Sequence, residues 1–165
     1  MSNNFEKGSA DETPEFEERV VNINRCSSVA KGGRTFSFSA LVVVGNHKGQ
    51  VGFGLGKSLE VADAIRKGAQ LARKNLITLP LNGGTIPHDV NAKFRGARVL
   101  MRPASKGTGL IAGGAMRAVL ELGGVHDVLA KSLGSNNPVN VVRATVEAIE
   151  ALESKEEILS KRGLA

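Results

Sequence analysis

The sequence predicts an α+β protein in two parts: an N-terminal three-stranded antiparallel sheet with one helix, followed by a C-terminal βαβα domain. Three observations support this class. Residues 35–44 and 50–55 alternate with the period of two that is typical of strands, and the first is rich in Phe and Val. Residues 59–77 and 138–152 repeat apolar residues at helical spacing. Proline and glycine gather in residues 80–87, which separates the two parts.

The N-terminal sheet is organised around residues 33–58. Before it, a strand is expected over residues 17–25, with Val21 and Ile23 facing inward. Asn46 and Gly49 give residues 46–49 the chemistry of a turn, because both residue types tolerate positive φ. In the strand that returns, three glycines share one face and leave it open to a helix, a neighbouring strand or a phosphodiester chain. These glycines are Gly52, Gly54 and Gly56. In the strand before the turn, the alternation places one set of residues on a single face: Phe36, Phe38, Ala40, Val42 and Val44.

A helix is predicted over residues 59–77, with Ser58 as its N-cap. One stripe of this helix is apolar and packs on the sheet: Val61, Ala62, Ile65, Ala69, Ala72 and Leu76. The opposite side is cationic: Arg66, Lys67, Arg73 and Lys74. Three strands and one helix therefore make up a small first domain.

The second part begins with a strand in which Val99 and Met101 face inward while Arg98 and Arg102 face outward. A helix over residues 112–122, a strand over 126–133 and a long helix from Pro138 follow, with Arg143 and Glu147 spaced as an i,i+4 pair. The expected division is a disordered acidic tail (1–15), a first domain (16–79), a linker and first strand (80–92), a second domain (93–153) and a C-terminal tail (154–165).

Charge is unevenly distributed along the chain. The 165 residues carry a net charge of +6, but residues 31–117 hold fourteen Lys or Arg against three acids. Residues 1–18 are acidic, with six Asp or Glu against Lys7. A basic block of this size predicts a polyanionic partner, most often nucleic acid; a solvated basic surface is the alternative. Two cations flank two glycines at Lys31, Gly32, Gly33 and Arg34, which predicts a hairpin tip able to reach into RNA.

Several classes of protein are disfavoured by composition. Cys26 is the only cysteine and the three histidines have no ligand spacing, so neither a disulfide framework nor a metal site is expected. No cofactor is expected. The longest apolar runs stay well short of 18 residues, which predicts a soluble cytoplasmic protein with no membrane partner.

Three glycine patterns could indicate nucleotide binding, and two of them fail on spacing. A phosphate loop ending in Gly56, Lys57 and Ser58 would need glycine where the chain has Val51, and a dinucleotide fingerprint from Gly52 would need glycine at Lys57. The third fits: Gly107 and Gly109 precede Ala112 in the relaxed fingerprint, with Asp127 twenty residues after Gly107. The arginines on the preceding strand count against a doubly wound fold. A nucleotide-binding enzyme using this turn is the alternative hypothesis.

Residues 33–57 closely resemble the signature of the bacterial small ribosomal subunit protein five family, as do the blocks at 103–117 and 131–145. The resemblance implies that the first domain is double-stranded-RNA-binding-like. It also implies a structural ribosomal protein that has neither catalysis nor a small-molecule substrate. Such a protein would bind small-subunit rRNA, contact small-subunit proteins four and eight, and lie near the path by which mRNA enters. It would contribute to head orientation and translational accuracy.

Charge and resemblance together give the expected site residues. Binding to rRNA is assigned to Lys31, Gly32, Gly33, Arg34, Lys57, Arg66, Arg73, Arg98 and Arg102. The resemblance implies that a loop beside an aminocyclitol antibiotic site includes Ser27, Ser28, Lys31 and Gly32. It further implies an interface with protein four at Gly107, Gly109, Gly113, Gly114 and Arg117. Because aromatic residues are sparse, recognition of RNA shape and backbone should dominate over base stacking.

Overall fold

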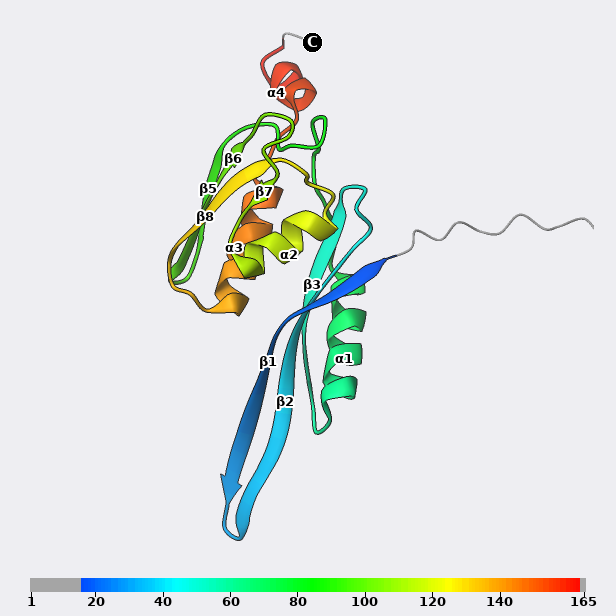
Figure 1. The fold of residues 1–165 in the computed structure, drawn as a ribbon, viewed down its shortest axis with the longest axis vertical. Helices are drawn as coiled ribbons and strands as arrows, with labels where there is room; N and C mark the ends of the chain where they lie inside the picture. Colours follow the sequence, from blue (N-terminus) through cyan, green and yellow to red (C-terminus); the bar gives the residue numbers. More distant parts are fainter. Residues whose placement is uncertain (1–15, 164–165) are drawn as a thin grey trace, which may run out of the picture.

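The computed structural model of the protein describes residues 16–163, so the predicted acidic tail at 1–15 lies outside the described residues. The first part contains β1 (Glu17–Ala30), β2 (Gly33–Gly45), β3 (Gln50–Ser58), α1 (Val61–Lys74) and β4 (Leu76–Thr78). The second contains β5 (Val90–Phe94), β6 (Ala97–Pro103), β7 (Leu110–Ile111), α2 (Gly114–Leu122), β8 (Val128–Gly134), α3 (Pro138–Glu150) and α4 (Lys155–Lys161). Figure 1 shows β1 and β2 projecting from the body as a long hairpin.

The α+β class is confirmed, but the N-terminal sheet has four strands in the order β1-β2-β3-β4 rather than three. The predicted helix ran too far at both ends. Ser58 is the last residue of β3, and the N-cap is Glu60, which makes no capping hydrogen bond through its side chain. At the other end, Asn75 leaves helical geometry and residues 76–78 pair with residues 50–52. A strand of three residues is too short to show a period of its own.

The glycine face of β3 packs against α1. A Cβ added to Gly52, Gly54 or Gly56 would lie 2.0–2.3 Å from a backbone carbonyl oxygen of the helix. Of the three candidates, a helix is therefore the one that packs against the glycine face of β3. The helix side of the contact is also made of small residues, which differ from the predicted stripe: Ala62 is exposed, and the buried residues are Ala64, Gly68, Ala69 and Ala72.

The apolar second half of β2 is buried on both faces. Ala40, Val42 and Val44 pack toward α1, as the alternation predicts. Leu41 and Val43 face the other way and join a second core with residues of the C-terminal part, including Val99, Leu120 and Ile149. The two parts of the chain thus share one hydrophobic core, and the run of consecutive apolar residues reflects burial on both sides.

The predicted inward position of Ile23 is wrong. Val21 does pack against the shared core, but Ile23 is 42% exposed. The pairing of β1 with β2 shifts between Val20 and Asn22, so Val21 forms a β-bulge. Because one extra residue in a strand moves every later side chain to the opposite face, Ile23 no longer shares the face of Val21.

The C-terminal sheet has the order β5-β6-β8-β7, in which only β7 and β8 pair in parallel. Figure 1 shows α2 and α3 on the side of this sheet that faces the N-terminal part. The start of α3 is as predicted: the Asn137 side chain accepts the Val139 N–H at 3.1 Å, and Pro138 holds the first helical position. The predicted pairing of Arg143 with Glu147 is wrong, because the Arg143 guanidinium lies over the rings of Phe94 and Phe53, 5.2 and 5.9 Å from their centroids.

Candidate nucleic-acid interface

The hairpin of β1 and β2 ends in an exposed segment. Residues 27–34 are all exposed, and the strands stay paired up to Ala30 and Gly33. Lys31 and Gly32 form the tip, as the sequence predicts, and Gly32 takes a φ of +121° there. A side chain at Gly32 or Gly33 would meet nothing within 4 Å. The tip therefore contributes nothing to either core.

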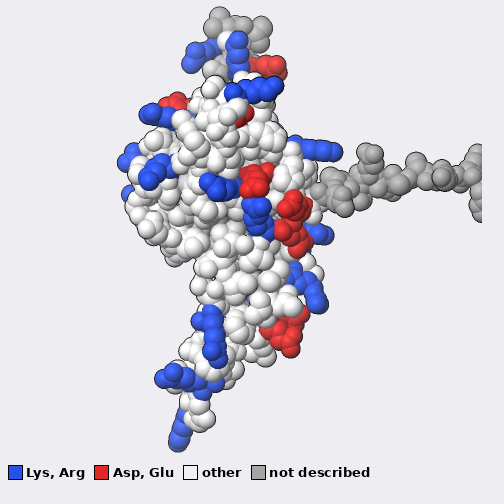
Figure 2. All heavy atoms as spheres, in the orientation of Figure 1, with Lys and Arg blue, Asp and Glu red and all other residues white. Residues whose placement is uncertain are grey.

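Beyond Glu17 and Glu18 at the start of β1, the hairpin has no acids and is therefore cationic. Residues 19–59 contain six Lys or Arg and no Asp or Glu. Arg25, which the sequence analysis did not single out, lies over the Phe36 ring at 3.8 Å, and this pair stiffens the distal hairpin. Figure 2 shows blue spheres without red along the lowest part of the projecting hairpin. A phosphate chain placed there would meet Arg25, Lys31 and Arg34, and the only carboxylates on the two strands, Glu17 and Glu18, lie at the far end of β1.

The cations of α1 are less free than the sequence suggests. Arg73 is paired with Glu18 of β1 at 2.9 Å, and Arg66 lies 3.6 Å from Asp63. Both pairs are exposed, so they contribute little to stability, but each places a carboxylate beside a predicted phosphate ligand. The Glu18 pairing joins residues far apart in the sequence and could not be read from local spacing.

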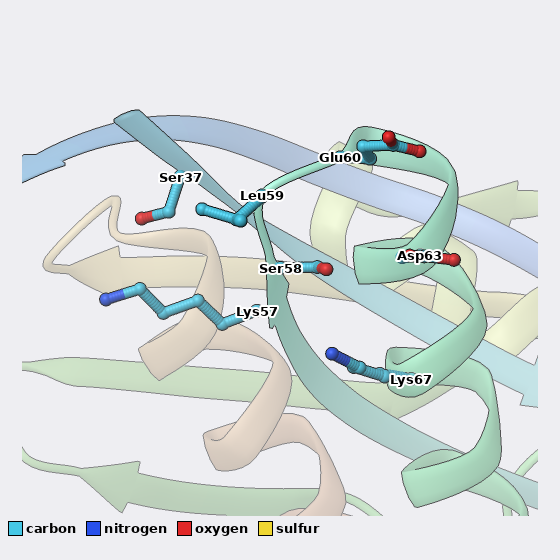
Figure 3. Close-up of a pocket in the computed structure, with 7 residues that line it drawn as sticks. All are labelled: Ser37, Lys57, Ser58, Leu59, Glu60, Asp63 and Lys67. Atoms are coloured by element: carbon cyan, nitrogen blue, oxygen red, sulfur yellow. The ribbon is translucent and has the colours of Figure 1, made fainter. Parts of the chain in front are cut away.

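Lys57 lines a cavity of about 440 Å³ where β3 passes into α1. Lys67 also lines it and brings a second cation from the helix. Figure 3 shows the lining residues, which mix these lysines with hydroxyls and two carboxylates: Ser37, Lys57, Ser58, Leu59, Glu60, Asp63 and Lys67. This is a polar hollow of mixed charge at the base of the hairpin.

The C-terminal sheet lies away from the hairpin tip (Figure 1). Arg98 and Arg102 of β6 are on its exposed face. Cross-strand partners share a face, so Lys93 opposite Arg98, and Lys131 opposite Leu100, bring two further cations to it. The Arg98 Nε–H donates to Asn91 Oδ1 at 2.9 Å. Lys131 was missed because it lies on β8 between Leu129 and Leu133, two apolar residues that share its face and hide the cationic character of that face in the sequence.

The predicted protein-interface residues lie together between β6 and the first turns of α2. Gly107 and Gly109 have φ values of +93° and +79°, and added Cβ atoms there or at Gly113 and Gly114 would meet nothing within 4 Å. Arg117 is exposed on α2. The turn does not offer its amides to a nucleotide: the N–H groups of Gly107 and Gly109 both donate to Asp127 Oδ1, at 3.0 and 2.8 Å.

A tight junction connects this region to the hairpin domain. The backbone N–H groups of His47 and Gly49, in the β2–β3 turn, donate to the carbonyls of Leu122 and Gly123 at the end of α2, at 2.9 and 3.0 Å. Beside it, Arg19 of β1 binds Glu121 of α2. This hydrogen bond lowers the pKa of Glu121 and raises that of Arg19. These contacts connect the hairpin domain directly to α2, so the hairpin and the loop before α2 belong to one continuous structure.

Within residues 16–163, no group of His, Cys, Asp and Glu side chains could hold a metal ion. Across the same part of the chain, no helix is both long and apolar enough to cross a membrane.

Comparison with known proteins gives matches over nearly the whole chain. The model of the ribosomal protein S5 N-terminal domain matches residues 16–80, and that of the ribosomal protein S5 C-terminal domain matches residues 92–162. A protein of Protochlamydia amoebophila is 55% identical over 159 residues, covering 96% of this chain and 93% of its own. One of Idiomarina loihiensis is 54% identical over 153 residues, covering 93% and 92%. Both carry the name small ribosomal subunit protein uS5.

Proposed function

The chain belongs to the ribosomal protein S5 family and is a small-subunit ribosomal protein rather than an enzyme, and we propose that it binds small-subunit rRNA chiefly through the acid-free distal part of its hairpin. The observation that carries this proposal is the exposed hairpin, in a stretch with six cations and no acids over residues 19–59. Phosphate binding needs positive charge without a competing carboxylate, and residues 27–34 combine that charge with full exposure.

Further rRNA contacts are proposed from the body of the protein. Lys57 at the base of the hairpin, Arg66 and Arg73 on α1, and Arg98 and Arg102 on the C-terminal sheet would bind phosphates. Gly32 and Gly33 would let the RNA backbone approach the tip. Arg66 and Arg73 must release or share their carboxylate partners to do so, so their contributions should be smaller than those of Lys31 and Arg34.

The tip is also proposed to help set the orientation of the subunit head. Ser27, Ser28, Lys31 and Gly32 would lie against rRNA beside the site of an aminocyclitol antibiotic. Support comes from the exposure of this segment and from its separation from both cores. A segment without core contacts can change its RNA contacts without changing the fold.

Protein contacts are proposed at the loop before α2. Small-subunit protein four would contact Gly107, Gly109, Gly113, Gly114 and Arg117, and protein eight is a second proposed partner. Gly113 supports this placement, because its φ of −65° and its open surroundings give the chain itself no reason for glycine there. A partner that approaches the backbone closely would supply one. Through these contacts, near the path by which mRNA enters cytoplasmic ribosomes, the protein would influence translational accuracy.

Two measurements with purified full-length protein test the rRNA proposal. Affinity for deproteinised small-subunit rRNA should fall steeply between 50 and 200 mM salt, because each phosphate contact releases bound counterions; about six contacts would weaken binding roughly a thousandfold. The native protein should also sediment with the small subunit at moderate salt. Affinity that is indifferent to salt would contradict a phosphate-driven interface.

A further inference from the structure

The turn that fits a dinucleotide fingerprint is filled by a carboxylate of the chain itself. Asp127 is only 8% exposed, and its Oδ1 accepts the N–H groups of Gly107 at 3.0 Å and Gly109 at 2.8 Å. Amides that converge in this way form a binding site for anions. The loop therefore has the geometry of a phosphate site, and an internal anion occupies it.

Other hydrogen bonds hold the same loop from inside. The Thr108 N–H donates to the Ser105 carbonyl at 3.1 Å, and the Val128 N–H donates to the Gly109 carbonyl at 3.2 Å. The Ala104 N–H donates to Thr85 Oγ1 at 3.3 Å. Every one of these partners lies within the loop or beneath it, so the loop's outward side is left to exposed residues such as Lys106 and Thr108.

The position of the carboxylate has two consequences. It fixes Gly107 and Gly109 in their left-handed backbone conformation, which defines the shape that the loop presents. It also places negative charge under the two amides, so that a phosphate would meet repulsion and no free donor there. The two amides are therefore unavailable to a phosphate of RNA, and the loop keeps one fixed shape for a protein partner.

We propose that Asp127 is a positioning and specificity-determining residue: it holds the 105–109 loop in the shape offered to a protein partner and excludes phosphate from it. The partner half of this proposal rests on the function proposed above. The geometric half, that Asp127 occupies an anion site made by the loop amides, does not depend on it.

Amide hydrogen exchange of the full-length protein, followed by NMR, tests the positioning role. Asp127→Ala should speed exchange at Gly107 and Gly109 by about tenfold or more, the loss of a hydrogen bond to a charged acceptor. Asp127→Asn keeps an oxygen acceptor and should retain most of the protection. Asp89→Ala, at an exposed acid outside this loop, is the control and should leave both amides unchanged. Equal exchange in Asp127→Ala and wild type would overturn the proposal.

Titration with inorganic phosphate tests the specificity role. The wild-type amides of Gly107 and Gly109 should not shift, whereas Asp127→Ala should show saturable shifts at both because the site is vacated. Shifts in the wild type would overturn the proposal, and this arm needs no variant that might fail to fold. If a folded Asp127→Ala protein shows no shifts, the specificity role is overturned. The positioning role is then decided by the hydrogen-exchange experiment alone.

A binding assay with small-subunit protein four separates this inference from the proposed function. If the loop is the interface, Asp127→Ala and Arg117→Ala should both weaken binding, while Asp127→Asn should largely restore it. If neither substitution weakens binding although exchange at Gly107 and Gly109 rises in Asp127→Ala, the proposed interface is wrong and the internal anion site stands.

Discussion

The glycines of the first domain have two opposite kinds of surroundings. Gly52, Gly54 and Gly56 on β3 face the backbone of α1, where an added Cβ would lie 2.0–2.3 Å from a carbonyl oxygen. Gly32 and Gly33 at the hairpin tip have nothing within 4 Å. Glycine thus allows close packing of β3 on α1 in one place, and at the hairpin tip it leaves an open surface. Stability and RNA binding should therefore respond to different substitutions.

The largest effect is expected at the packed glycines. Gly54→Ala would bring a Cβ to 2.1 Å from the Gly68 carbonyl oxygen and 2.7 Å from the Ala72 nitrogen. Because backbone atoms cannot move aside as a side chain can, the free energy of unfolding should fall by about 3 kcal/mol or more. Urea denaturation followed by circular dichroism measures it. Gly113→Ala, with ordinary φ and open space, is the matched control and should change stability little.

A smaller effect is expected at the tip. Gly32→Val meets no clash, but its φ of +121° is strained for any residue with a side chain, so unfolding should become easier by about 1–2 kcal/mol. The domain should stay folded, and susceptibility to the aminocyclitol antibiotic or head-dependent translocation should change in assembled ribosomes. If the variant instead loses the fold while drug response and translocation stay normal, the loop only connects β1 to β2 and has no role in head orientation.

The junction between the two domains predicts a still smaller, pH-dependent effect. Arg19 lowers the pKa of Glu121 in the folded protein, so between the folded and unfolded values the unfolded chain binds more protons. The pair thus stabilises the fold at neutral pH, and this contribution is lost as the pH falls through the folded pKa of Glu121. Both side chains are about 40% exposed, which limits the contribution to below about 1 kcal/mol.

Denaturation from pH 7 to pH 3 measures this contribution. Glu121→Gln should flatten the acid limb of the stability profile, and Arg19→Ala should flatten it similarly. The double substitution should do little more than either one, because both remove the same interaction. Strictly additive effects would show that the ion pair does not carry the pH dependence.

The strands and the hairpin were predictable because their signals are local. Alternation in residues 35–44, turn chemistry at residues 46–49 and the two glycines of the tip each occupy a few consecutive residues. The first helix was predicted less well. Its buried stripe of Ala64, Gly68 and Ala72 is made of small residues, which hydrophobic periodicity does not distinguish, and the sequence offered three possible partners for the glycine face.

The missed parts of the site are contacts between distant segments. Glu18 reduces the freedom of Arg73, and Lys131 joins the cations of β6 from another strand. The Asp127 carboxylate sits twenty residues from Gly107, a spacing that also suits a ribose contact in a dinucleotide site. The sequence alone could not tell whether Asp127 binds the loop amides or would contact a ribose, because the two roles differ only in where the carboxylate points.

The central claim is that the cations of the hairpin tip bind RNA and contribute nothing to either core. The most direct measurement compares rRNA affinity and unfolding free energy in Lys31→Ala/Arg34→Ala, with Lys155→Ala on α4 as a control that removes one exposed cation outside the hairpin. The account predicts that the double variant binds about tenfold or more weakly, with the salt slope reduced by about one unit per lost contact, while stability stays within about 0.5 kcal/mol. Unchanged affinity and slope in a folded double variant, or an equal loss in Lys155→Ala, would contradict it.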